Sequence, residues 1–108
     1  MITTIEIMSA ATFHAMLAHE KIVEAIRIAA SEFPITRAEY FGSYADGYAT
    51  EDSDLDLLVE FTEPSISILT IISLKHFLEE KLAKPVDVIH VPLPEGSIVE
   101  IGRTVRVL

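Results

Sequence analysis

The 108 residues suffice for one compact domain with one hydrophobic core and leave little room for a second. Half of the residues are hydrophobic, so the chain can bury enough apolar surface to fold, and we expect a partner to cover one apolar face. A formal net charge of −9 argues against unaided nucleic-acid binding, and the absence of cysteine excludes disulfides and thiolate metal sites.

The sequence pattern of the N-terminal third of the chain predicts helical structure. Residues 1–8 carry Glu6 and no basic cluster ahead of an apolar run, which does not fit a secretion signal and favours a cytoplasmic protein. Ser9 or Thr12 could cap one long helix, or the first of two, which Pro34 then ends. Its apolar positions recur at helical spacing: Leu17, Ile22, Ile26, Ala29 and Phe33.

Two strands with a short helical turn between them are predicted next. Residues 36–41 form a β-prone run that ends at Gly42. Residues 43–49 contain Gly47 and favour one turn of helix followed by a loop. Residues 55–61 alternate with a period of two, which indicates a second strand.

Pro64 and Ser65 are predicted to open a second long helix that packs on the sheet. The apolar stretch in residues 66–74 is shorter than the ~20 residues of a membrane span, so we expect no membrane segment. Residues 86–91 predict a third strand, and residues 93–108 a short helix and a β-like tail. The helix has a wide apolar stripe: Ile68, Leu69, Ile72, Phe77, Leu78 and Leu82.

The residues that carry chemistry form one spaced pattern. Gly42-Ser43 is followed, after ten intervening residues, by Asp54-Leu55-Asp56, and Asp87 interrupts the third strand. A glycine-serine bend lets backbone N–H groups approach phosphate oxygens, and the Ser43 hydroxyl can add a donor. We therefore predict that Gly42 and Ser43 bind a nucleotide.

The three aspartates predict a metal-dependent catalytic site. Asp54 and Asp56 lie two apart on a strand, so their side chains leave the same face with Cα atoms roughly 6.6 Å apart. Two Mg²⁺ ions that clamp a displacement at phosphorus lie ~3.5–4 Å apart, which this spacing suits. Asp87 would be a third ligand or the general base. Taken singly, each aspartate could be a turn or solvated strand residue, but carboxylates interrupting an apolar strand are costly without compensation.

The run Gly42-Ser43-Tyr44-Ala45-Asp46-Gly47, followed by Ser53-Asp54-Leu55-Asp56-Leu57, resembles the signature of the DNA polymerase beta-type nucleotidyltransferase superfamily, above all its minimal (MNT) branch. The likeness extends from Ile22 to the C-terminus. It implies an α/β (α+β) fold, a small mixed β-sheet with helices packed on one side. Residues 19–108 would be the nucleotidyltransferase domain, and residues 1–18 a helical N-terminal extension.

The resemblance also implies an ATP-like donor, two Mg²⁺ ions held by Asp54, Asp56 and Asp87, and pyrophosphate as the leaving group. Members of this branch commonly act as antitoxins that pair with a HEPN-domain ribonuclease toxin, in some cases by adenylylating a toxin tyrosine. A HEPN-type toxin is therefore the implied partner, in a homo- or hetero-oligomer.

One departure from the family concerns charge. The family usually has arginine where this chain has Asp46, and a carboxylate there would repel a triphosphate. Arg37, Lys75 and Lys84 are the candidate basic replacements, and an inactive, binding-only member is the alternative.

The histidines and most aromatic residues are assigned packing or surface roles. The four histidines lack the i, i+4 pairing or the cysteines of a zinc site: His14, His19, His76 and His90. Tyr40, Tyr44 and Tyr48 lie near the bend and could stack on a base, but packing is the favoured interpretation.

The leading hypothesis is transfer of a nucleoside monophosphate, AMP from ATP, to a hydroxyl of a partner protein. So small a domain leaves little chain for a dedicated acceptor pocket, which makes antibiotic modification a weaker alternative. The second hypothesis is an antitoxin without catalysis, whose acidic and apolar surface neutralises a basic ribonuclease by occupancy.

Overall fold

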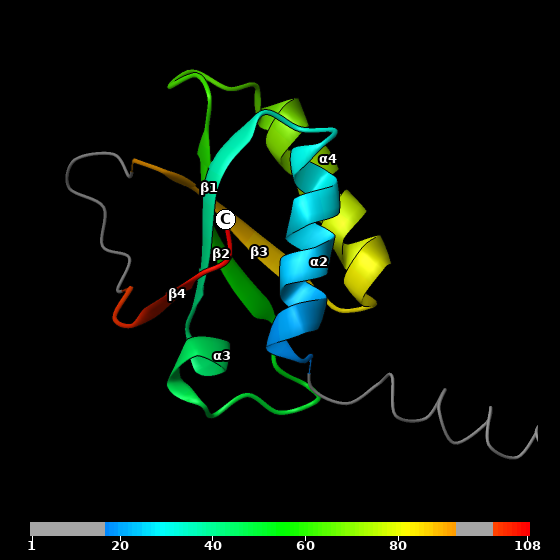
Figure 1. The fold of residues 1–108 in the computed structure, drawn as a ribbon, viewed down its shortest axis with the longest axis vertical. Coiled ribbons are helices and arrows are strands. Elements are labelled where there is room, and N and C mark those ends of the chain that lie inside the picture. Colours follow the sequence, from blue (N-terminus) through cyan, green and yellow to red (C-terminus); the bar gives the residue numbers. More distant parts are fainter. Residues whose placement is uncertain (1–16, 93–100) are drawn as a thin grey trace, which may run out of the picture.

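The computed structural model describes residues 17–92 and 101–108, which build a four-stranded sheet with two helices on one face (Figure 1). The elements follow in the order α2 (His19–Ala30), β1 (Ile35–Phe41), α3 (Ser43–Asp46), β2 (Leu55–Phe61), α4 (Ile68–Leu82), β3 (Val86–Val91) and β4 (Thr104–Arg106). The predicted α/β class, a mixed sheet with helices on one side, is confirmed.

The sheet has the strand order β3-β2-β1-β4. Strand β1 runs antiparallel to both β2 and β4, whereas β2 and β3 are parallel and are connected through α4. A parallel pair needs a long crossover connection, which the helix supplies. The three strands predicted before residue 92 are confirmed, and β4 lies in the predicted β-like tail. The short helix predicted there has no counterpart in residues 101–108, and residues 93–100 lie outside the described residues.

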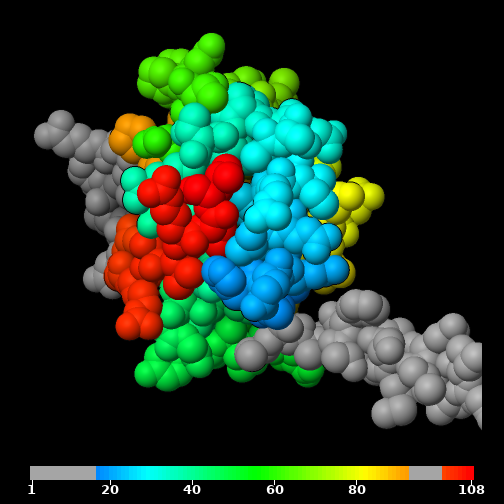
Figure 2. All heavy atoms as spheres, in the orientation of Figure 1, coloured from blue at the N-terminus to red at the C-terminus, as the bar shows by residue number. Residues whose placement is uncertain are grey.

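The core lies between the helices and one face of the sheet. Alternate β2 residues Leu55, Leu57 and Val59 are fully buried there, as the period of two predicted. Helix α2 contributes Ile22 and Ile26 to the same cluster. Near the C-terminus, Val105, Val107 and Leu108 pack against this core, and Figure 2 shows the last residues (red) beside α2 (blue to cyan).

The predicted boundaries of both long helices are wrong by a few residues. Helix α2 ends at Ala30, because residues 31–33 form a turn in which the Ser31 hydroxyl donates to the Ile28 carbonyl at 2.6 Å. The proposed caps Ser9 and Thr12 lie outside the described residues. Helix α4 begins at Ile68 and not at Pro64 or Ser65, since the Ser67 hydroxyl accepts the Leu69 N–H at 3.1 Å and caps the helix.

The predicted packing stripe of α4 is also wrong in its first turns. Ile68, Leu69 and Ile72 are 66%, 71% and 41% exposed. The buried helix positions are Leu74, Leu78 and Leu82, which recur every four residues, so Leu78 and Leu82 of the predicted stripe are confirmed. At about 100° per residue, Leu69 lies on the opposite side of the helix from Leu78, so one sheet cannot bury both. The described residues contain no helix long and apolar enough to cross a membrane.

Candidate active site

The aspartates come together where β2 and β3 begin. Parallel pairing places Asp56 directly opposite Asp87, next to the Leu55–Val86 pair. Because Leu55 and Leu57 point to the helices, the alternation of the strand directs Asp56 to the opposite, open face, and its register partner Asp87 shares that face. Asp54 lies two residues earlier and is exposed, as Asp87 is. The structure thus brings the predicted residues to one end of the sheet.

The neighbouring carboxyl groups affect the ionisation of Asp56. The pKa of Asp56 is raised first by burial, then by the negative charge of Asp87 and a side-chain hydrogen bond with it, and last by the charge of Asp54. Each cause disfavours the ionised form of Asp56. In the folded chain, a cation beside these groups would relieve the repulsion that raises this pKa.

The Gly42 bend lies directly against Asp56. Phe41, the preceding residue, pairs with Asp56 across β1 and β2. Gly42 has φ +72°, and a Cβ atom there would lie 2.5 Å from Oδ2 of Asp56. The Gly42 carbonyl accepts the N–H groups of Ala45 and Asp46 at 3.1 and 3.0 Å, which starts α3. Backbone conformation and the space beside the carboxylate therefore both require glycine.

Two contacts tie the loop before β2 to the beginning of β3. The Lys84 side chain is only 9% exposed, and its ammonium donates to the Glu51 carbonyl at 2.6 Å. One residue further along, the Pro85 carbonyl accepts the Leu55 N–H at 3.0 Å. Since Asp54 lies between Glu51 and Leu55, these contacts constrain it relative to Asp87.

A second anchor holds β3 to α4. Oε2 of Glu79 accepts the Lys75 ammonium at 2.7 Å and the Val86 N–H at 3.0 Å, while Lys75 also donates to the Val86 carbonyl at 2.8 Å. The hydrogen bond from Lys75, followed by that from Val86, lowers the pKa of Glu79. The anchoring roles of Glu79 and Lys84 were missed from the sequence. In the sequence these two residues are recognisable only as charged residues shortly before an apolar strand. Charged residues at the solvated end of any helix give the same pattern.

The donor set fits Mg²⁺ in kind. Carboxylate oxygens are the ligands that this ion prefers, and the Asp56–Asp87 pair supplies them beside the Gly42 bend. Within residues 17–92 and 101–108, however, no group of three or more His, Cys, Asp or Glu side chains is gathered as metal ligands are. The three-carboxylate metal site stays a prediction.

Two of the three tyrosines near the bend have packing roles. The Tyr40 hydroxyl contacts Nδ1 of His19 at 3.0 Å, and the Tyr44 hydroxyl accepts the Leu17 N–H at 3.3 Å. Tyr48, by contrast, is 80% exposed.

The described histidines include a second packing contact besides that of His19. His90 packs edge-on against the Phe61 ring, at 5.2 Å between centroids. His76 is exposed on α4, and His14 lies outside the described residues.

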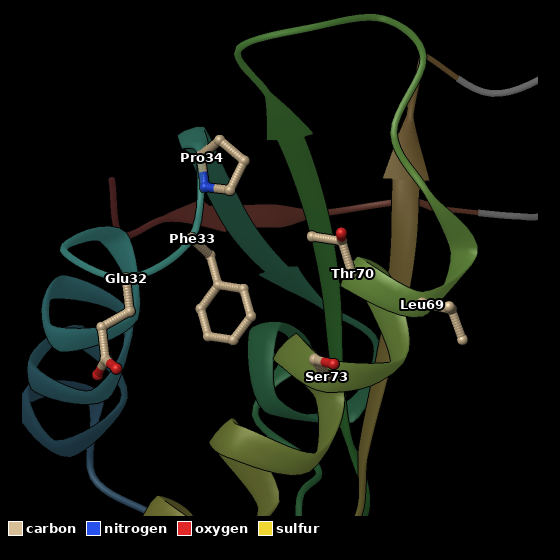
Figure 3. A pocket seen from close by; sticks show the side chains of 6 residues that line it. All are labelled: Glu32, Phe33, Pro34, Leu69, Thr70 and Ser73. Atoms are coloured by element: carbon tan, nitrogen blue, oxygen red, sulfur yellow. The ribbon is translucent and has the colours of Figure 1, made fainter.

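A pocket at the other end of the sheet is distinct from the aspartate site. It lies between the turn that precedes β1 and the beginning of α4 (Figure 3). The Phe33 ring points inward between the two helices, whereas the Leu69 side chain points outward. Its lining residues include no metal-binding cluster: Glu32, Phe33, Pro34, Leu69, Thr70 and Ser73.

The chain matches the model of one known protein family. Residues 22–106 match the nucleotidyltransferase domain family. The chain belongs to this family. The match includes the Gly42 bend and all three aspartates, and it begins and ends close to the described fold.

A curated relative is similar to about half of the chain. A provisionally named protein adenylyltransferase of Methanocaldococcus jannaschii, MJ0435, is 51% identical over 55 residues, which cover 51% of this chain and 58% of that protein. The chain thus spans little more than half the length of this relative.

Two solved structures share the fold. A toxin–antitoxin complex with AMP-PNP has a TM-score of 0.67 at 19% identity, with 85% of this chain and 73% of the other covered. A tri-AMPylated Shewanella oneidensis HEPN toxin in complex with its MNT antitoxin has a TM-score of 0.56 at 18% identity, covering 82% and 67%.

Proposed function

We propose that this protein transfers AMP from ATP to a hydroxyl of a partner protein, and that it acts as the antitoxin of a HEPN-type toxin. The observation that carries the proposal is the pairing of Asp56 with Asp87 beside a bend where only glycine fits. Family membership supports nucleotidyl transfer, and the name of the M. jannaschii relative supports AMP and a protein acceptor. The AMP-PNP and AMPylated-toxin complexes support the nucleotide and the partner.

In this proposal Asp54, Asp56 and Asp87 would hold Mg²⁺, which would neutralise charge on the phosphates and lower the pKa of an acceptor hydroxyl. Backbone N–H groups at Gly42 and Ser43, with the Ser43 hydroxyl, bind phosphate oxygens. The acceptor oxygen forms a bond to the α-phosphorus while the bond to pyrophosphate breaks. Asp87 is exposed and accepts the proton of that hydroxyl as general base.

The first experiment measures transfer of α-labelled AMP to the protein encoded by the neighbouring gene, in the presence of Mg²⁺. We expect label on that partner with the parent chain and a loss of roughly 10²–10³-fold in Asp54→Asn, Asp56→Asn and Asp87→Asn. Asp52→Asn makes the same chemical change on an exposed loop and serves as the matched control. Equal labelling by the parent and the three site variants would overturn the catalytic proposal.

A second candidate function is neutralisation by binding alone. Asp46 favours it, because this exposed carboxylate ends α3 one helical turn from Gly42, where it repels a triphosphate. The net charge of −9 suits a basic ribonuclease. The double variant Asp54→Asn/Asp56→Asn separates the two functions in a toxicity assay. Full protection by this variant, without label transfer by the parent, would favour binding alone.

A further inference from the structure

The proposed nucleotide site has a deficit of positive charge. Asp54, Asp56 and Asp87 lie at this end of the sheet, and Asp46 ends α3 beside it. A triphosphate is itself strongly anionic, so its tail needs a cationic contact beyond the metal ions that the carboxylates would hold. All eight lysines and arginines lie in the described residues, so the structure gives the surroundings of each.

Seven of the eight are placed or engaged elsewhere. Lys21 and Arg27 are on α2 and Lys81 is on α4, where its ammonium lies over the Phe77 ring. The predicted replacements are also engaged. Arg37 pairs with Glu39 at 3.2 Å, Lys75 with Glu79 at 2.7 Å, and Lys84 donates to the Glu51 carbonyl. Nε of Arg106 donates to the Leu108 carbonyl at 3.0 Å.

Arg103 is the remaining basic residue, and it directly precedes β4. Strand β4 pairs antiparallel with β1 through Tyr40–Val105 and Phe41–Thr104, so Arg103 adjoins the β4 residue that pairs with Phe41, the neighbour of Gly42. Arg103 is exposed and forms no ion pair within the described part of the chain. Figure 1 shows that β4 begins near the end of the sheet where α3 lies.

We propose that Arg103, which directly precedes β4 at the end of the sheet where the Gly42 bend lies, binds the phosphate tail of the nucleotide. The inference rests on the proposed nucleotidyl transfer and assigns the phosphate-binding cation of that same site. A guanidinium suits this role because it donates several N–H groups in a plane to phosphate oxygens and stays charged at any physiological pH. A phosphate contact from Arg103 also explains how an acidic chain, with Asp46 at this end of the sheet, can hold a triphosphate.

The test compares ATP and AMP binding to the full chain by calorimetry with Mg²⁺ present. Because a hydrogen bond to a charged group contributes about 1.5–3 kcal/mol, Arg103→Ala should raise the Kd for ATP by roughly 10- to 100-fold. The Kd for AMP, which lacks the tail, should change by less than about threefold. Arg103→Lys should recover part of the ATP affinity, which separates charge from structural support.

Arg106→Ala is the matched control, since it removes the same kind of side chain three residues further along the chain, at the end of β4. It should leave both Kd values within about twofold. Unchanged ATP binding in Arg103→Ala, or an equal loss of ATP and AMP binding, would overturn the role of Arg103 while leaving the transfer reaction standing. Absence of ATP binding by the parent chain would instead overturn the proposed function and this inference together.

Discussion

The two faces of strand β2 differ in what they contribute. On the helix side, Leu55, Leu57 and Val59 have no exposed surface, and Phe61 closes the core. On the open side, Asp56 meets Asp87, and Glu60 is exposed. One short strand therefore stabilises the fold with its odd-numbered residues and presents two carboxylates, Asp56 and Glu60, at even-numbered positions, whereas the even-numbered Leu58 is also buried. The alternation of a β-strand lets the two roles coexist without sharing a side chain.

The comparison also concerns free energy. Apolar burial on the helix face favours folding, whereas the crowded carboxylates on the open face oppose it, as the raised pKa of Asp56 indicates. Functional sites commonly reduce stability in this way. Substitutions on the helix face should therefore lower the free energy of unfolding, and neutralising substitutions at the aspartates should raise it.

The largest effect is expected from Leu57→Ala. This fully buried side chain lies at the centre of the sheet, so its truncation should lower the free energy of unfolding by about 3 kcal/mol. Denaturant titration measures the loss. Glu60→Ala, on the exposed face of the same strand, should stay within about 0.5 kcal/mol. Similar losses in the two variants would contradict the division between the faces.

Gly42→Ala should have the next largest effect, about 2 kcal/mol, because it strains a backbone with φ +72° and brings Cβ against Asp56. We expect label transfer to fall as well. Gly47→Ala is the control: its φ is +83°, but nothing lies within 4 Å of an added Cβ. That variant should lose about 1 kcal/mol from strain and keep its activity. Equal activity losses in both would show that the contact with Asp56 is unimportant.

Lys84→Met should cost about 1–2 kcal/mol, because it removes the donor to the Glu51 carbonyl while keeping the buried stem. We also expect lower transfer activity, since the loop that carries Asp54 loses one of its two ties to β3. Thermal unfolding and the rate of label transfer measure the two effects. Unchanged activity in a folded Lys84→Met variant would mean that the Leu55–Pro85 hydrogen bond positions the loop alone.

The smallest effect tests the open face directly. Asp56→Asn should raise the free energy of unfolding at pH 7 by roughly 0.5 kcal/mol, about 3 °C in Tm, after allowance for solvent screening. Because the folded pKa of Asp56 is raised, its contribution to stability is present at low pH and is lost as pH rises through that pKa. The advantage of the variant should therefore vanish in acid. A variant less stable than the parent at pH 7 would contradict the predicted repulsion.

Much of the fold could be predicted locally. The strands at 55–61 and 86–91 were predicted with their observed boundaries, because alternation and flanking turns are local signals. The apolar residues of α4 were harder to place. Leu78 and Leu82 of the predicted stripe are buried as predicted. Ile68, Leu69 and Ile72 look like core residues in sequence, and only the position of the sheet reveals that they are exposed and that Leu74 is buried.

The sequence by itself determined the chemical groups of this protein and their local spacing: a glycine-serine bend, one aspartate just before a strand and a second within it, a third on another strand, and the family to which they belong. Only the tertiary structure decided that Asp87 lies opposite Asp56, that Lys84 holds the loop before them, and that β4, which follows Arg103, pairs with β1 up to Phe41. The physical reason is that strand register couples residues far apart in the chain, and it depends on the packing of the whole sheet.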